Sequence, residues 1–93
     1  MSLPFPTLDD LRVGPDMATV RVREDGARLL VALDCDLLKI RRVLIDDFKR
    51  TFPGHGDRYW RAGTREWSLP REKRPLLDTW LYTWFEADAV IRV

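Results

Sequence analysis

The sequence predicts an α+β domain in which two helices pack on one face of an antiparallel sheet, in the order ββαββαβ. Residues 18–34 and 58–70 contain short stretches in which apolar and polar residues alternate, as in half-exposed strands. Two longer stretches, 34–54 and 71–88, repeat apolar residues at helical spacing. The length of 93 residues suits one small domain, whose core is thin enough that each large side chain matters.

The chain divides into a short lead-in and one domain. Residues 1–16 contain three prolines and a glycine and show no clear period, so we expect an irregular segment there. Residues 17–93 are predicted to form the single α+β domain. Neither part contains a defensible internal repeat or a low-complexity segment.

The first pair of strands is predicted from a turn between two apolar stretches. Residues 18–24 alternate, and residues 28–34 form a near-continuous apolar run that favours a central place in the sheet. Asp25-Gly26 is the expected central pair of the turn between them.

The two helical stretches differ in their boundary signals. In 34–54 an aspartate, Asp34 or Asp36, is expected to cap the first turn, and Pro53-Gly54 to end the helix. In 71–88 a proline suits the first turn. The apolar stripe of this second helix consists of Leu77, Trp80, Leu81 and Trp84, and we expect both tryptophans to lie in the core.

The second hairpin, at 58–70, carries the aromatic residues that bear on function. Trp67 should face the helices and pack in the core, while Gly63 is expected to absorb the turn. Consecutive strand residues face opposite ways, so either Tyr59 or Trp60 should point away from the helices. A short strand ends the chain, and the order βαββαβ from Arg28 onward is also that of ferredoxin-like folds.

The composition excludes several classes of function. The chain has one cysteine and one histidine, so it offers neither an internal disulfide nor a usual zinc site, and we expect no metal and no cofactor. It has no signal-peptide pattern and no apolar run long enough to cross a bilayer, so a cytoplasmic location is expected.

Catalytic patterns are also missing from the sequence. No nucleophile motif surrounds Cys35 or Ser68, and His55 in the Gly-His-Gly loop is expected to be an exposed loop residue. Adjacent Asp46 and Asp47 are expected to be solvated charges on the helix surface. We therefore expect a protein that is not an enzyme.

The distribution of charge and aromatic residues points to a ligand. The net charge is only +1, but residues 39–74 hold eleven Lys and Arg against five Asp and Glu. Aromatic rings among arginines on an exposed sheet are the composition that stacks bases and contacts phosphates. The predicted nucleic-acid-binding residues are Arg58, Tyr59, Trp60, Arg61, Arg65, Arg71, Lys73 and Arg74.

The stretch 43–81 also resembles a known family. A helix that ends in Phe-Pro-Gly is followed by an arginine, an aromatic residue and a short basic turn. A Trp seven residues after the aromatic residue, an apolar residue and a proline then precede the next helix. The matching residues are Phe52, Pro53, Gly54, Arg58, Trp60, Arg65, Trp67, Leu69 and Pro70. This pattern resembles the HARP domain of annealing helicases.

The resemblance implies a fold similar to PUR-type repeats and a curved sheet that binds nucleic acid, often single-stranded or at fork junctions. It carries Arg58, Trp60, Arg65 and Trp67 over as site residues. Where the family usually has Asp-Pro after the first aromatic residue, this chain has Arg61-Ala62, and it has no helicase motor.

Two functions follow as hypotheses. The first is a non-catalytic module that binds single-stranded or fork DNA through the basic aromatic hairpin. The alternative is a protein-interaction module, either a homodimer or a regulator of a larger machine, because the remainder of the chain is acidic and would repel nucleic acid.

Overall fold

The computed structural model describes residues 12–54 and 58–93. A single five-stranded sheet is built from β1 (Thr19–Asp25), β2 (Arg28–Asp34), β3 (Tyr59–Arg61), β4 (Glu66–Pro70) and β5 (Val90–Arg92). The two helices are α2 (Leu38–Thr51) and α4 (Arg74–Trp84), and two short 3-10 turns, Arg71–Lys73 and Ala87–Ala89, flank α4. The α+β class and the order ββαββαβ are therefore confirmed.

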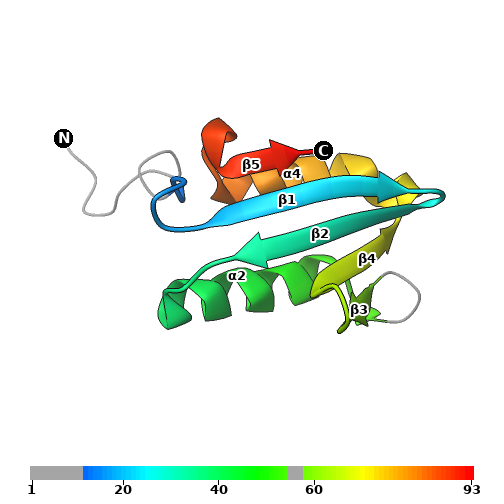
Figure 1. The fold of residues 1–93 in the computed structure, drawn as a ribbon, viewed down its shortest axis with the longest axis horizontal. Helices are drawn as coiled ribbons and strands as arrows, with labels where there is room; N and C mark the ends of the chain where they lie inside the picture. The colour runs from blue at the N-terminus through cyan, green and yellow to red at the C-terminus, as the bar shows by residue number, and fades with distance from the viewer. Residues whose placement is uncertain (1–11, 55–57) are drawn as a thin grey trace.

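The strands lie in the order β3-β4-β2-β1-β5, with the long strands β1 and β2 adjacent near the middle (Figure 1). All neighbours are antiparallel except β5, which runs parallel to β1, so the prediction of a purely antiparallel sheet is wrong at this strand. Strand β4 runs in the same direction as β1. The crossover through α4 brings the chain back so that β5 runs in the direction of β4, and β5 is therefore parallel to β1.

The expected ferredoxin-like order is only partly followed. Strand β4 lies between β2 and β3, as that order requires. However, β1 forms a tight hairpin with β2 and occupies the edge that β5 would take in a ferredoxin-like sheet. Strand β5 therefore pairs with the outer edge of β1.

The first hairpin turns one residue later than predicted. Asp25 pairs with Arg28, which leaves Gly26 and Ala27 as the two turn residues. Gly26 has a φ of 61°, whereas Ala27 has no positive φ, and glycine at the first position is what a type II′ turn requires. The aspartate ends β1 instead of entering the turn.

Both helices cover one face of the sheet. The core joins Val20 and Leu29 of the sheet to Leu44 of α2 and to Leu77 and Leu81 of α4. Alternation along each strand places the other residues of β1, β2 and β4 on the opposite, helix-free face. None of the helices in the described part is long and apolar enough to cross a membrane.

One carboxylate links the two helices. Asp47 Oδ2 of α2 accepts hydrogen bonds from the indole N–H groups of Trp80, at 2.9 Å, and Trp84, at 2.7 Å. The prediction that Asp47 is a solvated surface charge is wrong, because burial of the two indoles requires an acceptor for their N–H groups. The predicted core role of Trp80 is confirmed by its exposure of 5%, and Trp84 packs against the core at partial burial.

The start of α2 also differs from the prediction. The residue before its first turn is Leu37, and no side chain in the described part of the chain caps the helix, so neither Asp34 nor Asp36 acts as a cap. Asp34 is instead the last residue of β2, and Asp36 lies between that strand and the helix. The described end of the lead-in packs on the domain, since Val13 is buried and bridges to Phe85.

Candidate nucleic-acid interface

A notch opens in the sheet where β4 begins. Pairing between β4 and β2 stops at Val31 with Trp67, although β2 continues to Asp34. Arg65 precedes β4 and has a φ of 55°, a left-handed conformation that carries the chain away from β2. Gly63 lies in this turn, as predicted, but the residue with a left-handed conformation is Arg65.

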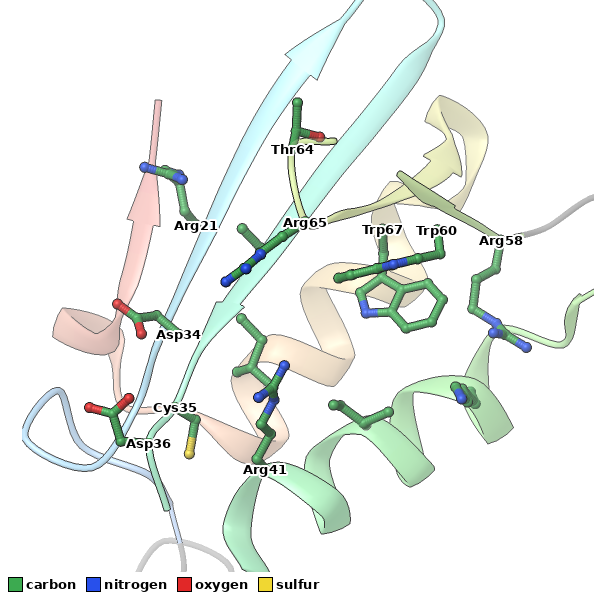
Figure 2. A pocket seen from close by; sticks show the side chains of 14 residues that line it. Arg21, Asp34, Cys35, Asp36, Arg41, Arg58, Trp60, Thr64, Arg65 and Trp67 are labelled. Carbon is green, nitrogen blue, oxygen red and sulfur yellow. The ribbon is translucent and has the colours of Figure 1, made fainter. Parts of the chain in front are cut away.

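The resulting groove, which we call the notch, has a volume of about 820 Å³. Its walls are the α2 face with Ile45, the end of β2 and the β3-β4 hairpin (Figure 2). It is lined by Arg21, Ala32, Leu33, Asp34, Cys35, Asp36, Arg41, Ile45, Lys49, Arg58, Trp60, Thr64, Arg65 and Trp67. Because strands alternate, this set comes from both faces of the sheet, so the notch cuts through its edge.

The two tryptophans of the notch have different environments. Trp67 is surrounded: Phe48 packs at 5.6 Å, and the cations of Arg58 and Lys49 lie over its ring at 5.1 and 5.7 Å. Trp60 lies against Trp67 at 4.8 Å and remains 47% exposed. Trp60 is therefore the ring in the notch that has a face for a ligand, while Trp67 supports it.

Five cations line the notch, against the two carboxylates of Asp34 and Asp36. Among residues 12–54 and 58–93, no carboxylate lies within ion-pair distance of Arg21, Arg41 or Arg65. Arg41 extends from α2 and Arg65 from the turn into the same hollow (Figure 2). Unneutralised guanidinium groups on opposite walls favour an anion in the notch.

Three of the predicted binding residues, Arg58, Trp60 and Arg65, lie in the notch. Arg58 is also held in place, since its Nε donates to the Phe52 carbonyl oxygen at 2.9 Å. Tyr59 is 57% exposed but lies on the opposite face, in register with Ser68. The expectation that Tyr59 and Trp60 face opposite ways is thus confirmed.

The other predicted cations do not line the notch. Arg61 lies 3.6 Å from the carboxylate of Asp25. Arg71 and Arg74 both contact Glu24, at 3.6 Å for Arg71. Lys73 stands in the turn before α4. The structure therefore separates the single basic surface expected from the sequence into a notch and a group of ion pairs.

The helix-free face carries a partly buried ion pair. Glu66 is only 3% exposed and accepts two hydrogen bonds from Arg23, at 2.8 and 2.9 Å. These bonds lower the pKa of Glu66 to about 2, although burial alone would raise it, and a hydrogen bond from Thr64 lowers it further. Beside this pair, Arg28 donates to the Ser68 hydroxyl and lies 5.3 Å from the Tyr59 ring.

Comparison with protein-family models, curated proteins and solved structures gives no match. The geometry of the notch alone therefore defines the candidate site. Within the described residues no group of three or more His, Cys, Asp or Glu could hold a metal, and His55 lies outside them. Ser68, which the sequence analysis considered as a nucleophile, lies on the helix-free face and accepts a hydrogen bond from Arg28.

Several notch residues were not singled out from the sequence. Arg41 and Lys49, with Ile45 between them, recur every four residues and share one face of α2. The sequence shows this four-residue spacing, but a basic helix face is usually exposed to solvent. The folded position of the β3-β4 hairpin shows that this face of α2 lines the notch. Arg21 lies between Val20 and Val22 in β1, so its side chain points to the face opposite the core.

Proposed function

We propose that the chain is a non-catalytic module that binds single-stranded nucleic acid, and single-stranded or fork DNA above all, in the notch. The observation that carries the proposal is a half-exposed Trp60 ring placed among arginines, of which Arg21, Arg41 and Arg65 have no ion-pair carboxylate among the described residues. A ring of this kind stacks on one base, and arginines beside it contact the phosphates on either side.

The arrangement of the cations favours a strand that passes through the notch. Arg41 and Lys49 stand on the α2 wall, and Arg58 and Arg65 stand on the hairpin side. A phosphate backbone between these walls would meet positive charge on both sides, and each neutralised phosphate releases counterions. Asp34 and Asp36 mark the less basic end of the notch.

The test is fluorescence anisotropy of a labelled oligo-dT of about ten nucleotides, a length in the range that small single-strand-binding folds occupy. Trp60→Ala should weaken binding by about 1–3 kcal/mol, the contribution of one stacked base. Arg41→Ala should reduce the slope of log K against log salt by about 0.7, as loss of one phosphate contact to a single strand does.

The matched control is Arg71→Ala, which removes the same charge from an arginine paired with Glu24 outside the notch. It should leave both the affinity and the salt slope nearly unchanged. Equal losses in the Arg41 and Arg71 variants would mean that net charge alone attracts the oligonucleotide. Absence of binding at low salt would contradict the proposal itself.

The HARP resemblance supports the same ligand class and remains part of the proposal. Of the residues it carries over, Arg58, Trp60, Arg65 and Trp67 all line the notch. A cytoplasmic location also belongs to this proposal, as the place where such a module would meet nucleic acid.

A protein-interaction role is the second candidate, and the outer face of α2 is the observation that favours it. Leu38 is 77% exposed there and lines a shallow groove of about 610 Å³ with Ile45, Arg41 and Arg42. Exposed apolar residues beside cations suit an acidic partner or a second copy of the chain. Sedimentation of the chain at two concentrations tests self-association, and Leu38→Asp should abolish any that is found.

A further inference from the structure

The direction of each main-chain hydrogen bond in β2 follows from the hairpin that joins β2 to β1. Asp25 and Arg28 flank a two-residue turn, so they exchange hydrogen bonds, and every second pair along the ladder does the same. The residues in between, Leu29, Val31 and Leu33, therefore direct their N–H and C=O groups away from β1.

Two hydrogen bonds support this alternation. The carbonyl oxygen of Val22, which is opposite Val31, accepts from Val93 N–H at 3.0 Å on the β5 side. The carbonyl oxygen of Ala27, two residues before Leu29, accepts from Arg71 N–H at 2.9 Å on the β4 side. Both bonds occur where the alternation requires them.

Leu33 is the next residue in the series that faces the β4 side, and on that side no strand of the described residues pairs with it. By register its partner would be Arg65, which instead adopts the left-handed conformation and belongs to the turn. Among the described residues no backbone hydrogen bond reaches Leu33 from that side. Its N–H donor and C=O acceptor therefore face the notch, which Leu33 lines.

The length of this open edge selects its occupant. Only residues 32–34 of β2 extend past β4, and a single residue, Leu33, directs its donor and acceptor outward. A peptide strand added there would gain only the two main-chain hydrogen bonds of Leu33, so this edge offers it little. A nucleobase needs one donor beside one acceptor, because its Watson–Crick edge presents a matching pair.

We infer that the main chain of Leu33 hydrogen-bonds the Watson–Crick edge of an unpaired base that stacks on Trp60. Trp60 pairs with Trp67, and Trp67 pairs with Val31, two residues before Leu33, so the Trp60 ring and the Leu33 main chain line the same notch. This inference rests on the proposed function and adds a reason for single-strand selectivity. In a duplex the Watson–Crick edge is already paired, so Leu33 cannot reach it.

Hydrogen exchange of the whole chain by NMR tests the edge directly. In the free protein the Leu33 amide should exchange at least about tenfold faster than the paired amides of Leu29 and Val31. Saturation with an oligo-dT of about ten nucleotides should slow Leu33 at least about tenfold and leave Leu29 unchanged. Protection of Leu33 equal to that of Val31 in the free protein would overturn the inference.

A modified ligand tests the base contact. An oligo-dT with N3-methylthymine keeps its rings and phosphates but loses the Watson–Crick N–H donor, so it should bind about tenfold more weakly than oligo-dT. Equal affinity of the two oligonucleotides, or unchanged Leu33 exchange in the saturated complex, would overturn this inference and leave the proposed function standing. Failure of unmodified oligo-dT to bind would overturn both.

Discussion

Arg65 stands where glycine is the favoured residue, and this makes its replacement informative. Its φ of 55° lies in the left-handed region, where a side chain with a Cβ costs about 1–2 kcal/mol. Arg65→Gly removes that cost but adds conformational freedom to the unfolded chain, worth about 0.4–1 kcal/mol in the opposite direction. Arg65→Ala removes the guanidinium and keeps the strain.

The expected order of stability is therefore Gly above Ala at position 65, by about 1 kcal/mol, the reverse of the usual order inside helices and strands. The side chain of Arg65 is exposed and has no carboxylate partner in the described part, so its loss should cost little by itself. Urea unfolding followed by tryptophan fluorescence measures this difference in the free energy of unfolding. The two variants are comparable if the slope of that free energy against urea concentration is the same in both.

Binding measurements on the same two variants distinguish the cost of the left-handed conformation from the contribution of the guanidinium group. Both should lose affinity for oligo-dT equally, because both lack the guanidinium in the notch. An alanine variant at least as stable as the glycine variant would refute the argument that Arg65 is held in an unfavourable conformation. Retained affinity in the glycine variant would refute its role as a phosphate contact.

Three further changes test other parts of the structure. Asp47→Ala should lower the free energy of unfolding by about 2 kcal/mol, because two indole N–H groups lose their acceptor, and urea unfolding measures it. Glu66→Gln should cost on the order of 2 kcal/mol at pH 7, less than the full pKa shift implies because Arg23 is 36% exposed. Since the folded pKa is depressed, this stabilisation is present above the ordinary carboxyl pKa and is lost as pH falls toward about 2, so wild type should lose more of its urea midpoint than the Gln variant between pH 6 and pH 3. Gly63→Ala should be neutral or slightly stabilising in thermal unfolding, because a Cβ there meets no atom within 4 Å and its φ is not left-handed, and a clear loss would contradict that account.

The local elements were predictable because each has a short-range cause. The alternation of Val20 and Val22 places β1 half in the core, and the stripe through Trp80 and Trp84 defines the buried face of α4. The turn at Gly26 was placed one residue early, because Asp-Gly suits a type I′ turn and only the pairing of Asp25 with Arg28 shows a type II′ turn. Such errors of one residue arise where two turn types compete at similar energy.

The candidate site was less predictable, because it depends on contacts between distant segments. Arg58, Trp60 and Arg65 were identified from composition, but Arg61, Arg71 and Arg74 have the same composition and lie in ion pairs instead. A guanidinium is available to a ligand only if no carboxylate neutralises it. That depends on Asp25 and Glu24, which lie more than thirty residues earlier in the chain.

The strands, the helices and their order can be read from hydrophobic periodicity, because it acts over a few residues and defines which face of each element is buried. Where β4 leaves β2, which arginines stay unneutralised and which main-chain groups face the notch become visible in the folded chain. These properties depend on register and on the left-handed turn at Arg65, and both are set by packing across the sheet. A local pattern does not contain that information, because the interacting residues meet only in the folded chain.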